Sequence, residues 1–296
     1  MYCVFRNSRS KKMSTYYMKT AALEDERPTS LDRSGGYVKN DFVVDAYDWI
    51  VPHLTREDIP FFLNAISESQ GHTLELGCGT GRVLIPIARA GFEITGMDLS
   101  NQMLSICRDK LAMESADTRS NVTALINCNM SDFSLRQHFD LVIIPFFTFN
   151  YLLTSTEQLS CLSSIRKHLK SSGKVILDLP NPRSCYLKED IYLNEFGDEP
   201  HFEMPDGRKG RRKYRISSRD LEMQRLGIET IYYIINPDGA ELRLVNEFVG
   251  HYLFAHDIES LMLRAGFEID HIYGGFSREA YDPQTSEDMI VVAHKT

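Results

Sequence analysis

The chain has 296 residues, of which 43% are hydrophobic and 25% charged, so it can bury one large core or one core with an appended lobe. Its formal net charge of -8 argues against a general nucleic-acid binder, which usually has a basic face. No apolar run approaches the ~18 residues that a membrane span needs.

The first 35 residues are polar, basic and without sustained periodicity, so we expect a mobile tail. The absence of acidic residues before Glu24 leaves an organelle-targeting role open beside that of a solvated tail. Ordered structure should begin near Tyr37, with helical spacing over residues 42–50 and a helix over residues 58–66. The start of the chain lacks the apolar stretch of a secretory signal, which predicts a cytoplasmic protein.

A short apolar strand follows at residues 73–76, and it leads into three alternate glycines: Gly77, Gly79 and Gly81. A helix pattern over residues 82–91 and a second apolar run that ends at Asp98 come next. This order is that of a nucleoside-binding βαβ unit, in which glycines let the backbone turn sharply and approach a ligand. Asp98 is placed to accept hydrogen bonds from both hydroxyls of a ribose.

The carboxylate of Glu75, two positions before Gly77, helps to separate two cofactor classes. It would repel a pyrophosphate that binds at a helix N-terminus, whereas it suits the ammonium and sulfonium of S-adenosylmethionine. The third glycine also falls one position earlier than in G-x-G-x-x-G. The sequence therefore favours a methyl donor over a dinucleotide, with an NAD-dependent oxidoreductase as the alternative.

Residues 74–82 (Leu-Glu-Leu-Gly-Cys-Gly-Thr-Gly-Arg) and 96–104 (Gly-Met-Asp-Leu-Ser-Asn-Gln-Met-Leu) resemble the class I S-adenosylmethionine-dependent methyltransferases. The similarity is greatest to the small-molecule branch, which includes glycine/sarcosine and amino-sugar N-methyltransferases, and it continues through residues 129–133, 139–147 and 168–178. The resemblance implies an α/β, Rossmann-like fold with a seven-stranded doubly wound sheet and an antiparallel last strand. The candidate donor-binding residues are Tyr47, Glu75, Gly77, Cys78, Gly79, Gly81, Asp98, Leu99, Met103, Asn129, Met130 and Phe146.

Some of these roles depend on the resemblance alone. Relatives pack an apolar side chain against the adenine at the position of Met103. Many have an aspartate at the position of Asn129, and an asparagine can still accept a hydrogen bond through its carbonyl oxygen. In such relatives an N-terminal element folds over the donor, which makes Tyr47 a candidate near the transferred methyl, with packing at a helix interface as the alternative. For Cys78 we expect a small side chain that fits the turn, not a nucleophile.

The fourth strand is expected over residues 139–147, and its C-terminal end should open the crevice of the sheet. Residues 144–147 read Ile-Pro-Phe-Phe, without the polar head that enzymes methylating nucleic-acid bases have at this corner. The residues around it form an aromatic wall with one amide, suited to a small organic or cationic acceptor, although some of them must simply fill the core: Phe146, Phe147, Phe149, Asn150 and Tyr151.

Residues 184–255 alternate like antiparallel strands, with a hairpin turn at residues 236–239, and we interpret them as an inserted β lid. The basic run at residues 208–215 is expected at the solvated tip of a hairpin, with phosphate or RNA binding as the alternative. A helix over residues 255–266 and two more strands complete the core. The expected parts are therefore a tail (1–35), an N-terminal cap with the donor-binding core (36–183), the lid (184–255) and the C-terminal part of the core (256–296).

These features predict S-adenosylmethionine-dependent methylation of a small molecule, at nitrogen or oxygen. The alternatives are a protein or RNA methyltransferase and a catalytically silent S-adenosylmethionine-binding subunit. The candidate general bases are Tyr151, His251 and Tyr252, and the candidate substrate-binding residues are Tyr47, Phe147, Asn150, Tyr151, His251 and Tyr252. The six cysteines show no metal-ligand spacing, so we expect free thiols and no metal site. Neither a nucleic-acid partner nor a membrane is expected, and the sequence leaves the oligomeric state open.

Overall fold

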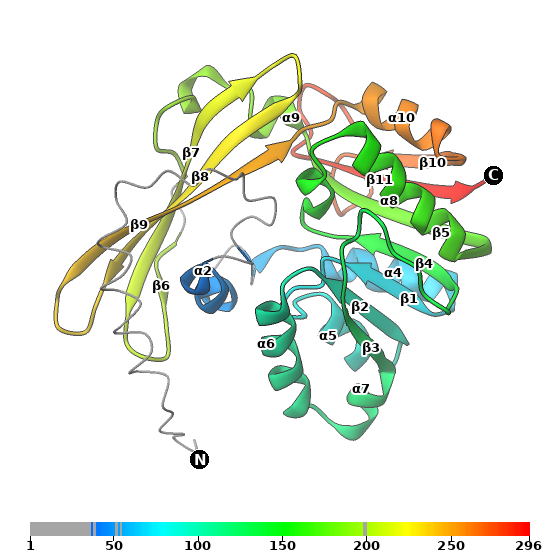
Figure 1. Cartoon of the computed structure of the whole chain (residues 1–296), viewed down its shortest axis with the longest axis horizontal. Helices are drawn as coiled ribbons and strands as arrows, with labels where there is room; N and C mark the ends of the chain where they lie inside the picture. Colours follow the sequence, from blue (N-terminus) through cyan, green and yellow to red (C-terminus); the bar gives the residue numbers. More distant parts are fainter. Residues whose placement is uncertain (1–36, 38–39, 51–52, 54, 198–199) are drawn as a thin grey trace. The chain divides into compact units, whose positions relative to one another are not determined.

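The computed structural model describes residues 37, 40–50, 53, 55–197 and 200–296. The tail expected over residues 1–35 lies outside them. Within the described residues, a seven-stranded sheet has the order β10-β11-β5-β4-β1-β2-β3, and a four-stranded sheet has the order β6-β7-β8-β9 (Figure 1). None of the helices in these ranges is long and apolar enough to cross a membrane.

The seven-stranded sheet is parallel except at β11, which runs antiparallel to both β5 and β10. This arrangement confirms the predicted doubly wound sheet with an antiparallel last strand. The strands are β1 (Thr73–Leu76), β2 (Ile94–Asp98), β3 (Val122–Asn127), β4 (Phe139–Ile144), β5 (Leu169–Pro180), β10 (Phe267–Tyr273) and β11 (Asp288–Lys295).

Helices cover both faces of this sheet (Figure 1). Successive residues of a strand point to opposite faces, so Val142 and Ile144 of β4 pack in the core cluster under α8 and α10, and Leu141 and Ile143 pack in the cluster under α4, α5 and α6. The helices are α2 (Asp41–Ala46), α4 (Ile59–Ser69), α5 (Leu84–Arg89), α6 (Asn101–Ala112), α7 (Ala116–Asn121), α8 (Ser155–His168), α9 (Pro182–Cys185) and α10 (Ala255–Arg264), with short 3-10 turns η1 (Tyr47–Trp49), η2 (Thr148–Tyr151) and η3 (Glu189–Ile191).

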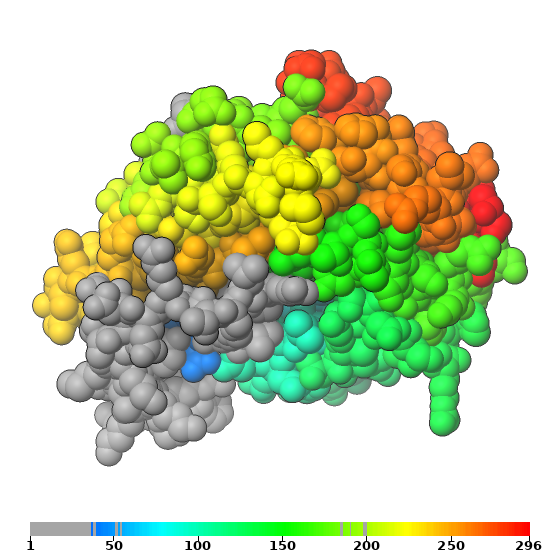
Figure 2. Space-filling model, turned by 45° about the horizontal axis from the view of Figure 1, so that its top comes forward, coloured from blue at the N-terminus to red at the C-terminus, as the bar shows by residue number. Residues whose placement is uncertain are grey.

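The four-stranded antiparallel sheet consists of β6 (Phe202–Glu203), β7 (Lys209–Asp220), β8 (Arg225–Ile235) and β9 (Glu241–His251). The turn expected at residues 236–239 joins β8 to β9, and the Gly239 N–H donates to the Asn236 carbonyl at 2.8 Å. In the space-filling view the yellow residues of this sheet adjoin the green residues of the core (Figure 2).

The position expected for the basic run was wrong. Only Arg208 lies next to a hairpin turn, the one between β6 and β7. Residues 209–215 lie along β7, because the strand extends further in both directions than its alternating pattern indicated. Strand alternation then sends neighbouring charges to opposite faces. Arg211 is exposed, whereas Arg212 is buried with 4% of its surface accessible.

The corner after β4 has an unusual backbone. The strand ends at Ile144, three residues earlier than expected, because Phe146 and Phe147 both adopt left-handed conformations, with φ of 54° and 62°. Such a conformation costs a non-glycine residue roughly 1 kcal/mol or more. Asp178 of β5 holds this turn: its carboxylate accepts from the Phe146 N–H at 2.7 Å, and its backbone carbonyl accepts from the Phe147 N–H at 3.1 Å.

The carboxylate of Asp178 is also paired with Arg56. The guanidinium donates to it at 2.9 Å and to Asp288 at 3.3 Å, and it lies 4.7 Å from the centre of the Phe147 ring. Burial raises the pKa of Asp178 to about 6, and the positive charge of Arg56 opposes this rise. Asp178 is therefore mostly ionised at neutral pH, as its contacts with two donors require.

We expect Asp178→Asn to lower the free energy of unfolding by about 3 kcal/mol, because it removes one charge from a buried pair and leaves Arg56 less neutralised. Denaturant titration followed by circular dichroism measures the change. The exposed Asp117 of α7 offers a matched control, since Asp117→Asn makes the same chemical change on the surface and should cost less than about 0.5 kcal/mol. Equal losses in the two variants would contradict the role given to Asp178.

Candidate active site

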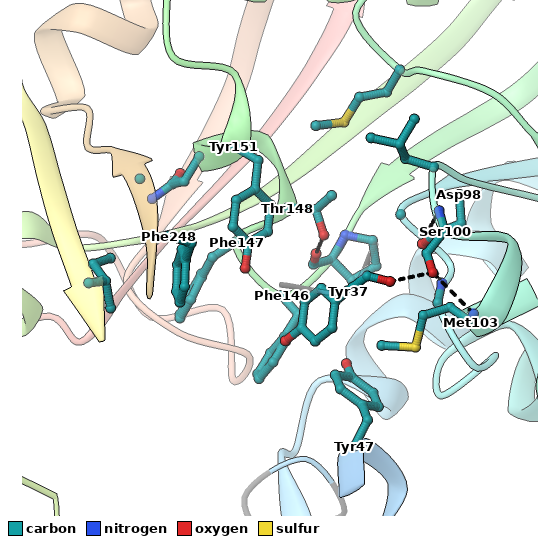
Figure 3. Close-up of a pocket in the computed structure, with 18 of the residues that line it drawn as sticks. Tyr37, Tyr47, Asp98, Ser100, Met103, Phe146, Phe147, Thr148, Tyr151 and Phe248 are labelled. Atoms are coloured by element: carbon teal, nitrogen blue, oxygen red, sulfur yellow. Dashed lines mark hydrogen bonds between the residues drawn. The ribbon is translucent and has the colours of Figure 1, made fainter. Parts of the chain in front are cut away.

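One cavity of about 580 Å³ extends from the glycine turn to the inner face of the four-stranded sheet. Asp98, Ser100 and Met103 lie at one end, Tyr151 and Phe248 lie at the other, and Phe146 stands between them (Figure 3). This is the C-terminal edge of the parallel strands, where open α/β sheets bind their ligands.

The glycine turn needs its glycines for two reasons. Gly77, Gly79 and Gly81 all have positive φ, at 75°, 52° and 84°. A Cβ on Gly77 would lie 2.4 Å from the Thr148 side chain, and one on Gly81 would lie 2.7 Å from Cys107 Sγ. The turn therefore brings bare backbone to the cavity wall, which Gly77 and Gly79 line and Gly81 does not.

The carboxylate of Asp98 is fixed by the turn itself. One oxygen accepts from the Gly79 N–H at 2.8 Å and the other from the Ser100 N–H at 2.7 Å. Burial raises the pKa of Asp98, and these two N–H groups oppose that rise. A carboxylate has about four acceptor sites, so each oxygen can also accept from a ribose hydroxyl.

Glu75 belongs to the same cavity wall. It is 2% exposed, lines the cavity, and its Oε2 has no hydrogen-bond partner among the described residues. Burial raises the pKa of this carboxyl group. Since an unpaired buried carboxylate is costly, a cationic ligand group fits here, and the ammonium of S-adenosylmethionine is such a group.

The other candidate donor-binding residues also lie on the cavity wall: Tyr47, Cys78, Leu99, Met103, Asn129, Met130 and Phe146. Asn129 Oδ1 already accepts from the Ser131 N–H at 2.9 Å, which leaves it one further acceptor site. The Cys78 thiol is buried, and burial raises its pKa, so it presents no thiolate to a ligand.

The sequence reasoning missed three residues that lie near the donor end: Tyr37, His53 and Ser100. The Ser100 hydroxyl caps α6 by accepting from the Met103 N–H at 3.2 Å, and it donates to the Tyr37 carbonyl at 2.5 Å. The Tyr37 and Tyr47 rings meet edge to face at 5.6 Å between centroids. Nothing in the sequence indicated that this hydroxyl would hold the Tyr37 carbonyl.

His53 joins the N-terminal segment to the four-stranded sheet. Its Nε2 lies 2.9 Å from Arg212 Nη1 and its Nδ1 lies 2.9 Å from the Tyr47 carbonyl. Arginine can only donate, so Nε2 accepts and Nδ1 carries the proton that goes to Tyr47. Burial, followed by the charge of Arg212, lowers the pKa of His53, which keeps the ring neutral.

The acceptor end of the cavity is built from alternate residues of β7, β8 and β9. Ile216 pairs with Ile228, which pairs with Phe248, and this gives an apolar row across the sheet. Tyr214 pairs with Thr230 in a more polar row beside it. On the core side, Phe147, Asn150 and Tyr151 line the cavity as expected. The Tyr151 and Phe248 rings lie 5.7 Å apart across the two sides (Figure 3).

Besides Gly81, two expected residues do not line the cavity, Tyr252 and Phe149. Tyr252 is 2% exposed. It follows the end of β9 and packs edge to face against Phe254 at 5.6 Å, in the cluster that includes Leu226 and Ile228. It is therefore not placed to bind a substrate or to act as a base in this cavity. Phe149 is fully buried in the core cluster under α8 and α10.

His251 does line the cavity, with 7% of its surface exposed. Burial lowers the pKa of His251 to about 4, and the charge of Arg225 contributes to this shift as the second cause. The ring is therefore neutral near pH 7. Its Nδ1 lies 3.2 Å from Nε2 of Gln158, a buried residue of α8.

Comparisons with known proteins agree with this geometry. The family model for the methyltransferase domain matches residues 73–173. A putative methyltransferase of Bacillus subtilis is 30% identical over 45% of this chain, and the match spans 52% of that protein, about half its length. A putative methyltransferase of Geobacillus sp. is 27% identical over 75% of this chain and 83% of its own length. The cypemycin N-terminal methyltransferase of a Streptomyces species is 22% identical over 86% of this chain and 97% of its own length.

Two solved structures share the fold. The CcbJ methyltransferase from Streptomyces caelestis has a TM-score of 0.71 and 22% identity, and the match covers 90% of this chain and 99% of that one. CalS10, an amino pentose methyltransferase from Micromonospora echinaspora solved with bound S-adenosylmethionine, has a TM-score of 0.61 and 19% identity over 81% of this chain and 91% of its own. With the glycine turn, Asp98 and the strand order described above, the family match identifies residues 73–173 as a methyltransferase domain, and the chain has the fold of the class I S-adenosylmethionine-dependent methyltransferases.

Proposed function

We propose that this chain transfers the methyl group of S-adenosylmethionine to a small-molecule acceptor, at nitrogen or oxygen and preferably at nitrogen. The observation that carries the proposal is the single cavity that joins the Asp98 end to the inner face of the four-stranded sheet. Its volume of about 580 Å³ is in the usual range for small-molecule sites. Such a cavity can enclose a donor and a small acceptor, and it could not easily admit a nucleic-acid duplex.

The donor, when bound, supplies a methyl group on a positively charged sulfur that is already reactive. The protein then has to orient the two partners and exclude water. In this proposal Asp98 holds the ribose, Glu75 the ammonium, and Met103 packs on the adenine. Phe146, which stands between the two ends of the cavity, and Tyr47, which also lines it, shield the reacting centre.

The names of similar proteins support nitrogen as the acceptor atom. CalS10 is described as an amino pentose methyltransferase, and the cypemycin enzyme as an N-terminal methyltransferase. The first name gives an amino pentose and the second an N-terminus, so both named acceptors carry an amino nitrogen, and they differ as molecules. For this chain, the four-stranded sheet that lines the acceptor end of the cavity favours an acceptor as small as a sugar.

The basic run gives little support to an RNA substrate. On the outer face of the sheet, Arg215 is paired with Glu229 at 2.5 Å and Lys209 with Glu203 at 3.7 Å, so carboxylates balance part of its charge. On the inner face, Arg212 is buried against the cavity. A phosphate-binding surface needs exposed cations that carboxylates do not already neutralise.

A radiolabelled-methyl assay on cell extracts tests the proposed function. We expect label from S-adenosylmethionine in the low-molecular-weight fraction, and in amines within it. Label confined to RNA or to protein would contradict a small acceptor. A chain that binds the donor and labels no fraction would instead be a silent binding subunit.

Asp98→Asn should weaken the binding of S-adenosylmethionine and S-adenosylhomocysteine roughly 10- to 100-fold, because hydrogen bonds to a charged carboxylate are lost. Calorimetry on the folded variant measures this change, and Asp117→Asn serves again as the surface control. NAD should bind to neither the variant nor the parent chain. Unchanged donor affinity would contradict the role given to Asp98.

A further inference from the structure

The His251 ring at the cavity wall has one tautomer, and its contact with Gln158 determines which nitrogen carries the proton. Gln158 is 1% exposed, and its Nε2 donates to the Leu152 carbonyl at 2.9 Å. This contact fixes the orientation of the amide, because the reverse orientation would set Oε1 against another carbonyl oxygen. The amide nitrogen therefore also faces His251, with its second N–H.

An amide nitrogen donates and does not accept. The 3.2 Å contact between Gln158 Nε2 and His251 Nδ1 thus requires a lone pair on Nδ1. A neutral imidazole with a bare Nδ1 carries its proton on Nε2. His251 is neutral near pH 7 because burial and Arg225 of β8 lower its pKa to about 4, while Asp257 of α10 acts weakly in the opposite direction.

The Nε2 side of the ring is the side available to a ligand. Gln158 holds the Nδ1 side and is not part of the cavity wall, whereas His251 is. Nε2 has no hydrogen-bond partner among the described residues. An N–H donor with no partner in such an enclosed place is unfavourable until something accepts from it.

We propose that His251 Nε2–H donates a hydrogen bond to an oxygen atom of the methyl acceptor, and that Gln158 is the positioning residue that fixes this tautomer. The inference rests on the proposed function and narrows its substrate class to a small amine with a hydroxyl, ether or carbonyl oxygen. The apolar row that ends at Phe248, together with Tyr151, lies beside His251 and suits an apolar face on the same molecule.

This role replaces that of general base expected for His251. Nε2 already carries a proton, and a proton on Nδ1 would break the contact with Gln158. The acceptor must therefore lose any surplus proton to another group or to solvent. His251 recognises the acceptor and does not deprotonate it.

The tautomer can be measured before any acceptor is known. Long-range ¹H–¹⁵N correlation spectra of the full chain, with the His251 signals assigned by their loss in His251→Gln, should show a protonated Nε2 and a bare Nδ1 at pH 7. A protonated Nδ1, or an imidazolium, would overturn the proposal. In Gln158→Leu the ring should lose its single tautomer, while Gln137→Leu, at an exposed position before β4, should leave it unchanged.

Two substitutions separate a donor from a base. His251→Gln keeps an N–H donor and cannot serve as a base, whereas His251→Met has similar bulk and offers neither. We expect His251→Gln to keep kcat/KM for the labelled amine within about threefold of the parent, and His251→Met to lower it about tenfold or more, mainly through KM. Donor affinity, measured by calorimetry, should stay constant in both and so reports correct folding.

The outcomes distinguish this inference from the proposed function. Equal loss in both variants, with donor affinity intact, overturns the donor role of His251 alone. A preference for amines without an oxygen atom overturns it as well. A parent chain that labels no small molecule overturns the proposed function, and this inference with it.

Discussion

The ion pair between Asp178 and Arg56 is the constraint on which the site depends. Two successive phenylalanines in left-handed conformations would not persist without support, and Asp178 binds the backbone N–H of the first and, through its own carbonyl, that of the second. Arg56 holds the Asp178 carboxylate and lies over both rings, at 5.2 and 4.7 Å. The strained corner places Phe146 at the middle of the cavity (Figure 3), so a buried charge pair at the end of β5 sets the boundary between its donor and acceptor ends.

The two ends of the cavity obtain their specificity in different ways. The donor end uses groups at the carboxyl ends of adjacent parallel strands, where Glu75 and Asp98 are fixed by backbone that one short motif supplies. The acceptor end uses alternate side chains of an antiparallel sheet, and each can change without disturbing the ladder of hydrogen bonds behind it. Such a division lets one donor site serve many acceptors, which is consistent with the different acceptors in the names of the similar proteins.

The same difference explains what could be predicted from the sequence. The turn from Gly77 to Asp98 is local, so its residues and their spacing already specify the geometry. The acceptor side is not local. Whether Arg212 or Arg211 faces the cavity depends on which face of β7 packs inward, and a shift of the strand by one residue would bring Arg211 to the inner face in place of Arg212. Tyr252 was misassigned because its ring packs against Phe254, a contact that the strand pattern does not specify. His53 was missed because its partners, Tyr47 and Arg212, lie in separate parts of the chain.

The two buried histidines of the cavity wall show what a neutral ring contributes there. His53 uses both nitrogens within the protein, one toward Tyr47 and one toward Arg212, so it links structural parts and has nothing left for a ligand. His251 uses one nitrogen, toward Gln158, and keeps one N–H. During transfer to an amine, positive charge moves from the donor sulfur to the acceptor nitrogen. An imidazolium beside that nitrogen would oppose the movement, and a neutral N–H donor can hold a neighbouring oxygen without opposing it. The burial that makes His251 a poor base is thus what makes it compatible with the charge that this reaction creates.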